Sequence, residues 1–319
     1  MSASGAEAVV DDGWVDCPQG HRFDVRRGVL HAIGALTPQI AGQLEENARE
    51  RRGELSDGEK NAYRRNISRI GIATYNRLIR DNARAALDAI GISGGRSLDL
   101  GGGSGWLAAE LAGRDFEAVS LDIEDPLERL AQIEEGAGGR DFELVTDVLD
   151  KPGSEGVDYV VGDMEQLPFA DGAFDLVTTS AALHHSSDPV RTLRQAARVL
   201  RPGGVLLALN EPAKGVFRDE SPILGGRGEA AGEHLYWART YVRFFRAAGL
   251  EPRLRFPGWI DRVLRERDWA GVVYYRRLLP LAGWLWSVPV VRSLARGPLL
   301  RPAIDLFGLT LICEARKPA

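Results

Sequence analysis

The stretch that decides the fold is Ser97-Leu98-Asp99-Leu100-Gly101-Gly102-Gly103-Ser104-Gly105-Trp106. A short apolar run ends in an acid, three glycines follow at alternate positions, and a helix-like segment begins at Trp106. This order predicts a strand, a tight turn and the start of a helix. Glycine suits such a turn because it adopts positive φ freely and lets a ligand lie against the backbone. Free N–H groups at a helix start favour a negatively charged ligand group.

The glycine turn alone leaves the identity of its ligand open. Gly103-x-Gly105-x-x-Ala108 also fits the dinucleotide fingerprint of nicotinamide-dependent oxidoreductases, and a plain strand–helix turn is a third interpretation. Asp122 ends the next apolar stretch, where a carboxylate can accept hydrogen bonds from both ribose hydroxyls. Nicotinamide-dependent enzymes use the same device, so Asp122 does not discriminate between the ligands.

Two later segments do discriminate. Residues 160–177 read VVGDMEQLPFADGAFDLV, which predicts two strands joined by a short loop. Residues 193–207 read LRQAARVLRPGGVLL, a helix that Asp188 can cap and that Pro202-Gly203-Gly204 end before the next strand. Together with the glycine turn, and in this order, they resemble the class I S-adenosylmethionine (SAM)-dependent methyltransferases. The resemblance covers about residues 96–211 and the final strand.

The resemblance implies SAM as the cofactor and S-adenosylhomocysteine as its product. It implies that Asp122 accepts from the ribose, that Asp163 accepts from the adenine amino group, and that Met164 packs on the adenine face. The cofactor-binding residues that it implies are Asp99, Gly101, Gly103, Gly105, Asp122, Ile123, Asp163, Met164 and Ser180.

Apolar strands alternate with helical segments, which predicts an α/β fold with a mostly parallel sheet covered by helices on both faces. By the resemblance the sheet is Rossmann-like and seven-stranded, with one antiparallel strand. The expected strands are 97–100, 118–122, 159–161, 174–179, 205–210, 253–256 and 309–315. We expect a ribbon-like segment and linker over 1–50, the SAM-binding core over 51–256, a helical lid or insertion over 257–308 and the final core strand over 309–319.

Composition favours a cytoplasmic enzyme. The chain has 319 residues, 44% of them hydrophobic, and its N-terminus lacks the basic start and apolar core of a signal peptide. Its two cysteines, Cys17 and Cys313, lie far apart and imply no disulfide framework. A net charge of −5 argues against a dedicated nucleic-acid partner.

The N-terminal stretch Cys17-Pro18-Gln19-Gly20-His21-Arg22-Phe23-Asp24-Val25 resembles the second half of the zinc ribbon of bacterial 23S rRNA guanine-N1 methyltransferases. A closed zinc site needs four ligands, and only Cys17 and His21 are present here. We therefore expect a ribbon remnant that keeps its hairpin and holds no metal. A site completed by a partner or by a distant residue is the alternative.

Two helical regions flank the expected core. Residues 61–90 form an amphipathic leading helix in which Arg64, Arg65 and Tyr75 are placed to approach the cofactor or the substrate, with ordinary packing as the alternative. Residues 257–308 are rich in aromatic residues and arginine. We interpret them as a lid that shapes an apolar acceptor pocket. Contact with a membrane surface through 269–308, RNA binding and a dimer contact are the alternatives.

The catalytic candidates are His184 and His185, which follow the fourth strand at the sheet edge where ligands bind in such folds. An OH or acidic C–H acceptor needs a base, and either histidine can serve. A structural wall of the cofactor pocket is the alternative role, and Asn210 and Glu211 are weaker candidates.

The sequence predicts methyl transfer to oxygen or carbon of a small apolar or polycyclic molecule in biosynthesis. The alternatives are an rRNA or tRNA methyltransferase and a SAM-binding partner subunit without catalysis.

Overall fold

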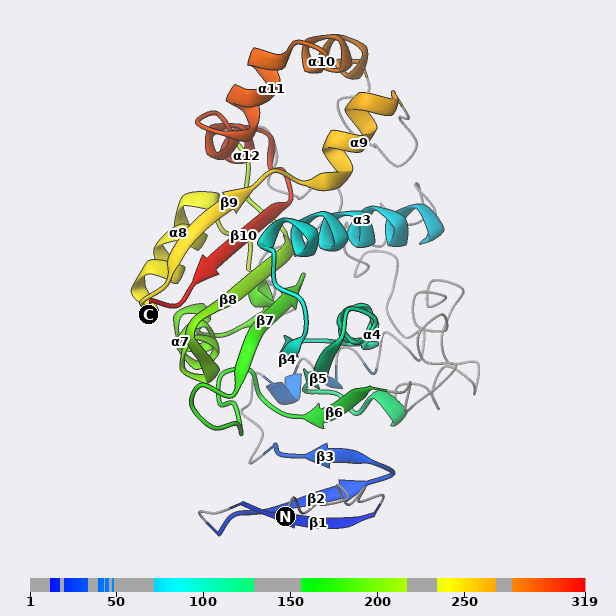
Figure 1. Cartoon of the computed structure of the whole chain (residues 1–319), viewed down its shortest axis with the longest axis vertical. Helices are drawn as coiled ribbons and strands as arrows, with labels where there is room; N and C mark the ends of the chain where they lie inside the picture. Colours follow the sequence, from blue (N-terminus) through cyan, green and yellow to red (C-terminus); the bar gives the residue numbers. More distant parts are fainter. Residues whose placement is uncertain are drawn as a thin grey trace, which may run out of the picture.

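The computed structural model describes residues 12–17, 20–33, 40–42, 44–45, 48, 72–128, 156–216, 234–267 and 277–318. The described strands form one sheet in the order β1-β2-β3-β6-β5-β4-β7-β8-β10-β9 (Figure 1). Its parallel centre consists of β6 (Val157–Val161), β5 (Phe116–Asp122), β4 (Gly95–Leu100), β7 (Phe174–Ser180) and β8 (Leu200–Glu211). The predicted α/β fold is confirmed.

The last strand is antiparallel, as predicted. β10 (Leu311–Arg316) pairs with β8 on one side and with β9 (Glu251–Arg255) on the other, both in antiparallel register. The insertion that separates β9 from β10 in sequence therefore leaves and re-enters the sheet at neighbouring strands. Arg255 and Glu314 form an ion pair across this β9–β10 pair.

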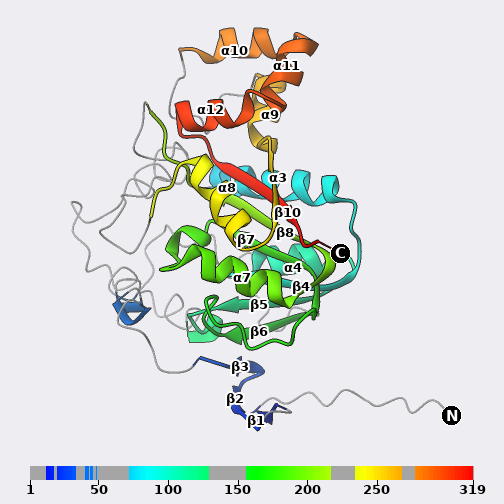
Figure 2. The same ribbon diagram turned by 90° about the vertical axis from the view of Figure 1, so that its left-hand side faces the viewer.

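Helices cover both faces of the sheet because its central strands are apolar on both sides. Leu206 and Ala208 of β8 pack toward α7 (Pro189–Val199) and α8 (Ala238–Ala247). The alternate residues Val205, Leu207 and Leu209 pack toward the face covered by α3 (Ile72–Ile90) and α4 (Trp106–Ala112). Figure 2 shows α7 on the near face of the sheet and α4 behind it.

The predicted leading helix is partly described. α3 presents Leu78 and Ile79 to the interior, as expected of its apolar face. Residues 61–71, with Arg64 and Arg65, lie outside the described residues, and so does the side chain of Tyr75.

The ribbon-like N-terminal strands extend the main sheet. β1 (Gly13–Asp16), β2 (Arg22–Arg26) and β3 (Val29–His31) form an antiparallel meander, so the predicted hairpin is present. β3 then pairs in parallel with β6, which makes the sheet three strands wider than the seven expected. His31 Nε2 lies 3.3 Å from Asp125 Oδ2 in the segment after β5, so side chains reinforce this junction.

The described part of the predicted insertion, residues 257–267 and 277–308, forms four helices: α9 (Gly258–Glu266), α10 (Leu279–Trp286), α11 (Pro289–Arg296) and α12 (Leu300–Phe307). They lie at the end of the molecule opposite to β1–β3 (Figure 1). Trp269, Tyr274 and Tyr275 fall outside the described residues. No described helix is both long and apolar enough to cross a bilayer.

Gly101 offers a direct test of the fold at the end of the central strand. Its φ is +65°, and a Cβ added there would lie well inside van der Waals contact with Ala182 Cβ. Gly203 has a similar φ of +74° but open space around it. We expect Gly101→Ala to lower the free energy of unfolding by about 2–4 kcal/mol, from backbone strain plus overpacking, and Gly203→Ala by about 1 kcal/mol. Urea unfolding without cofactor measures both, and equal losses would contradict the packed turn.

Candidate active site

The glycine turn has the predicted strand–turn–helix geometry. Gly101, Gly103 and Gly105 all adopt positive φ, at +65°, +54° and +77°. The amides of Gly101 and Gly102 donate to the carbonyl of Leu121, at 2.8 and 3.1 Å, which fastens the turn to the end of β5. Gly105 then caps the N-terminus of α4. The turn is thus held between the two central strands and the helix that follows.

The turn uses several of its own N–H groups. The Gly105 amide donates to the carbonyl of Gly102 at 2.8 Å, and the Gly103 amide donates to Asp122 Oδ2 at 2.9 Å. Together with those of Gly101 and Gly102, these donors build the turn. That the N–H groups at the start of α4 favour a negatively charged ligand group stays a prediction. What the glycines provide is a backbone surface without side chains.

Asp122 is fixed in position beside the turn. Its Oδ2 accepts from Gly103, and its Oδ1 accepts from the amide of Glu124 at 3.0 Å. A carboxylate has about four acceptor positions and can accept from several donors at once, ribose hydroxyls among them. Ile123, the next predicted contact, is half-buried at the same strand end.

Asp99 lies underneath the turn. Thr178 Oγ1 of β7 donates to its carboxylate at 2.8 Å, and a Cβ on Gly102 would lie 3.2 Å from Asp99 Oδ2. Burial raises the pKa of Asp99 to about 7, with a further contribution from the charge of Asp122. The side chain is therefore held among protein groups below the backbone surface that a cofactor would meet.

The predicted adenine contacts lie at the end of the neighbouring strand. The Gly162 amide donates to the carbonyl of Asp122 at 2.8 Å, which brings the start of the Asp163–Met164 loop beside the ribose candidate. Asp163 Oδ1 accepts from the amide of Glu165 at 2.7 Å, and burial raises the pKa of Asp163. Met164 packs against the core of the sheet.

Glu165, which the sequence analysis did not single out, ties this loop to the histidine segment. Its Oε1 accepts from the amides of Ser187 and Asp188, at 2.7 and 3.0 Å, and from the Ser186 hydroxyl at 3.0 Å. Burial alone would raise the pKa of Glu165, but these hydrogen bonds hold it below its ordinary value. The Asp163–Met164 loop and the segment that follows His185 are therefore joined by one carboxylate.

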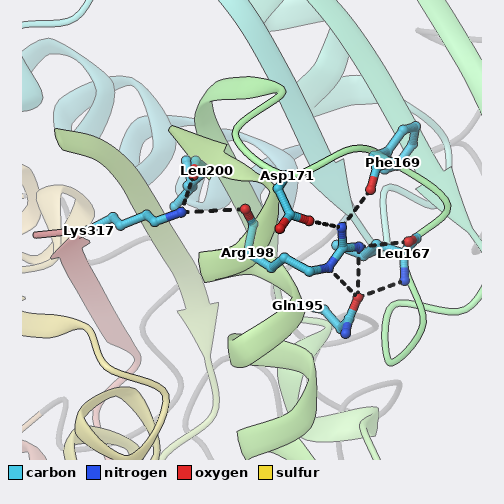
Figure 3. Close-up of polar contacts among 7 residues, drawn as sticks. All are labelled: Leu167, Phe169, Asp171, Gln195, Arg198, Leu200 and Lys317. Atoms are coloured by element: carbon cyan, nitrogen blue, oxygen red, sulfur yellow. Dashed lines mark hydrogen bonds and ion pairs between the residues drawn. The ribbon is translucent and has the colours of Figure 1, made fainter. Parts of the chain in front are cut away.

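Arg198 of α7 holds the remainder of the loop (Figure 3). Its guanidinium donates to the carbonyls of Leu167 and Phe169, at 2.9 and 2.7 Å, and to Asp171 Oδ1 at 2.7 Å. Lys317 Nζ donates to the carbonyl of Leu200 at 2.6 Å just beyond this point. The fork geometry of arginine suits such a cluster of oxygens. This arrangement explains how residues 193–207, quoted above, support residues 160–177.

The two candidate histidines differ in their surroundings. His184 lies in the 3-10 turn η2 (Leu183–His185), and its Nδ1 is 3.0 Å from Glu211 Oε2 at the end of β8. The fully buried Glu211 carboxylate also accepts from the backbone amides of Ala182, Leu183 and His184, so it caps the turn as well as contacting the ring. His185 Nδ1 is buried, and none of the residues that the structure describes forms a hydrogen bond with it. Burial, together with the neighbouring His184 and His234, holds the pKa of His185 well below its ordinary value.

Ser180 belongs to a buried polar chain that reaches the insertion. Asn210 Nδ2 donates to Ser180 Oγ at 3.0 Å, and Asn82 Nδ2 donates to Asn210 Oδ1 at 2.7 Å. The amide of Trp259 in α9 donates to Asn82 Oδ1 at 3.1 Å. The chain joins β7, β8, α3 and α9 at the carboxyl edge of the sheet. Asn82 carries no motif in the sequence, so only the fold reveals its position.

The N-terminal pair lies away from these residues. Cys17 Sγ is 3.3 Å from His21 Nδ1 beside the β1–β2 connection. Within the part of the chain that the structure describes, no group of three or more His, Cys, Asp or Glu side chains is arranged to hold a metal ion. That the remnant holds no metal stays a prediction.

Comparison with known proteins agrees with this geometry. A family model described as a methyltransferase domain matches residues 98–208. An uncharacterized methyltransferase of Mycobacterium sp. is 34% identical over 209 residues, which cover 63% of this chain and 73% of that protein. The demethylmenaquinone methyltransferase of Roseiflexus castenholzii is 30% identical over 193 residues, 56% of this chain and 70% of the relative.

The chain belongs to the class I SAM-dependent methyltransferases. The match to other relatives is shorter: the demethylmenaquinone methyltransferase of Beutenbergia cavernae is 38% identical over 125 residues, 39% of this chain and 44% of that protein. The match covers less than half of this relative, so the similarity concerns the methyltransferase core and not the whole protein.

SAM is the cofactor of this methyltransferase, and the described residues fit it. Asp122 has acceptor capacity for the ribose beside a backbone surface without side chains, and Asp163 and Met164 offer an acceptor and an apolar surface on the next strand. The His184–Glu211 pair lies beyond β7 at the same carboxyl edge of the sheet.

The buried Asp99 predicts a pH-dependent stability. Its pKa is about 7 in the folded chain and about 4 when unfolded, so its contribution is complete below about pH 4 and is lost as the pH rises through 7. Asp99→Asn cannot ionise. We expect this variant to gain stability relative to the wild-type chain between about pH 5 and pH 8, measured by urea unfolding. A difference that does not change over this range would contradict the assignment.

Asp122 predicts the strength of cofactor binding. We expect Asp122→Ala to weaken SAM binding by about 1–3 kcal/mol, because a charged acceptor of hydrogen bonds is removed. Calorimetric titration measures the affinity. Glu117→Ala is the matched control, since Glu117 is an exposed carboxylate on the same strand, and its affinity should equal that of the wild type. Unchanged SAM affinity in Asp122→Ala would exclude the ribose role.

Proposed function

We propose that this enzyme methylates carbon or oxygen of a small apolar acceptor that carries a ring hydroxyl, of the hydroquinone or phenol class. The observation that carries the proposal is the buried pair of His184 and Glu211 at the carboxyl edge of the sheet. When bound, SAM supplies an electrophilic methyl group. A ring hydroxyl becomes a strong oxygen or carbon nucleophile when a base removes its proton.

His184 has the arrangement of a general base. Glu211 is bonded to three backbone amides, which keep its carboxylate in one position, and Nδ1 of the imidazole faces that carboxylate. Nδ1 therefore carries the proton, and Nε2 is left as the basic nitrogen. In the proposed reaction Nε2 takes the hydroxyl proton of the acceptor, and Glu211 stabilises the resulting imidazolium.

His185 has a different role in this proposal. Its low pKa keeps the ring neutral, and its ring centroid lies 4.1 Å from that of His184. It packs beside the base and limits its orientations. Of the two histidines predicted as catalytic candidates, we therefore assign proton removal to His184.

The insertion supports an apolar acceptor. α9 is anchored to α3 through the Trp259 amide and through the ion pair between Arg262 and Asp81 at 2.7 Å. The Asn82–Asn210–Ser180 chain connects this anchor to the site. We propose that the insertion serves as a lid that keeps water from the acceptor, since a dry site strengthens every electrostatic interaction within it.

Two of the relatives are named demethylmenaquinone methyltransferases, and a quinone precursor is an apolar ring acceptor of this class. We propose that the enzyme works in the cytoplasm, as its composition led us to expect.

His184→Ala tests the proposed base. With a soluble naphthohydroquinone as acceptor and labelled SAM, we expect methyl transfer by the wild type and about 10²–10⁴-fold slower transfer by the variant, with SAM affinity little changed. His185→Ala should slow transfer far less. Collapse of SAM affinity in His184→Ala would make the residue a wall of the cofactor pocket, and transfer to tRNA without transfer to the hydroquinone would contradict the acceptor class.

A further inference from the structure

The insertion exposes an unusual amount of apolar surface. Most of the exposed large apolar side chains among the described residues lie between positions 278 and 306. They are Leu278, Leu281, Trp284, Leu285, Val290, Leu294, Leu299 and Leu306. Large exposed apolar patches mark interaction sites in soluble proteins, and these side chains are concentrated on helices that follow one another in the chain.

The exposed side chains share faces of two helices. In α10, Leu281, Trp284 and Leu285 follow the i, i+3, i+4 spacing of one face, with Leu281 57% and Trp284 59% exposed. In α11, Val290 and Leu294 are one turn apart, Val290 is 62% exposed, and none of the residues of the helix is buried. α11 therefore has an apolar stripe that the described protein does not cover.

The two helices are fixed in position, so this exposure is a built feature. Asp261 of α9 accepts from Trp286 Nε1 at 3.0 Å and pairs with Arg296 of α11. Trp286 holds the inward side of α10, because its ring stacks on that of Phe256 with the ring centroids 4.8 Å apart. These contacts use Trp286 and Arg296 as inner anchors and leave Trp284 and Leu281 on the other side of α10.

The charge of this region indicates what covers it. Residues 277–308 contain Arg277, Arg292, Arg296 and Arg301 but a single acid, Asp305, in a chain with a net charge of −5. Asp305 accepts from the amide of Ala238 and so faces α8. A cationic, apolar and Trp-bearing surface is complementary to anionic lipid headgroups over acyl chains. A second copy would bring like charges together.

We propose that α10 and α11, with the flanking residues Leu299 and Leu306, form a membrane-docking surface for a bilayer that contains anionic lipids. Leu281, Trp284, Leu285, Val290 and Leu294 enter the interface, and the exposed Arg277 and Arg301 contact headgroups. The surface lies on the membrane without spanning it. The lid over the site would then face the bilayer, where apolar molecules dissolve. Docking does not depend on the acceptor or on methyl transfer.

Vesicle sedimentation of the full chain tests the proposal. We expect binding to phosphatidylcholine vesicles that contain phosphatidylglycerol and much weaker binding to phosphatidylcholine alone. Arg277→Gln with Arg301→Gln should weaken binding about thirtyfold, from about 1 kcal/mol for each charge near an anionic surface. The control pair, Arg243→Gln with Arg246→Gln on α8, removes equal charge from exposed positions elsewhere and should have a much smaller effect.

The apolar part of the surface has its own matched control. Leu281→Ser with Trp284→Ser should weaken binding about tenfold or more. Trp14→Ser with Val15→Ser removes exposed apolar side chains from β1 at the opposite end of the molecule and should leave binding unchanged. Circular dichroism and thermal unfolding verify that each variant is folded.

Two vesicle results would overturn the proposal: no binding to either kind of vesicle, or an equal loss of binding in the test and control pairs. A third contrary result is a wild-type chain that does not bind vesicles but forms a dimer in sedimentation velocity, when Leu281→Ser with Trp284→Ser is the only variant that abolishes the dimer. The last result would make this face a contact between copies. None of these measurements uses SAM or acceptor, so failure here is separable from failure of the proposed function.

Discussion

Three hydrogen bonds from backbone amides join the ends of the two central strands, β4 and β5. The Gly103 amide donates to the Asp122 carboxylate, and the amides of Gly101 and Gly102 donate to the carbonyl of Leu121. The chain can leave β4 and start α4 in so short a distance only because three glycines adopt positive φ. The same turn covers Asp99 and sets Asp122 beside a bare backbone surface. The positions of Asp99 and Asp122 therefore both depend on this one hydrogen-bonded glycine turn.

In the proposed function, the acceptor side of the site depends on the buried carboxylate of Glu211. Glu211 ends β8, caps the turn after β7 and contacts His184, so two adjacent strands define the position of one imidazole. Glu165 then connects that segment to the Asp163–Met164 loop. In the proposed function, two polar clusters from different strands meet at one sheet edge, which is what the parallel arrangement makes possible.

The central strands and the glycine turn were predictable because their signals are local. Apolar runs such as Val205–Leu209 and a turn that only glycine can adopt are legible within a few residues. The pairing of β3 with β6 was not predicted, since nothing within residues 29–31 specifies a partner strand far along the chain. Asn82 was missed for the same reason: its partners, Asn210 and Trp259, come from distant elements. Glu211 was a weak candidate, because its role depends on the turn that packs against it.

The most direct test of the central claim is a crystal structure of the full chain with S-adenosylhomocysteine. The account predicts ribose hydroxyls on Asp122, the adenine beside Asp163 and Met164, and a sulfur directed toward the side of the site that His184 faces. The space between that sulfur and His184 Nε2 should admit one aromatic ring. A nucleoside bound elsewhere, or a sulfur directed away from His184, would contradict it.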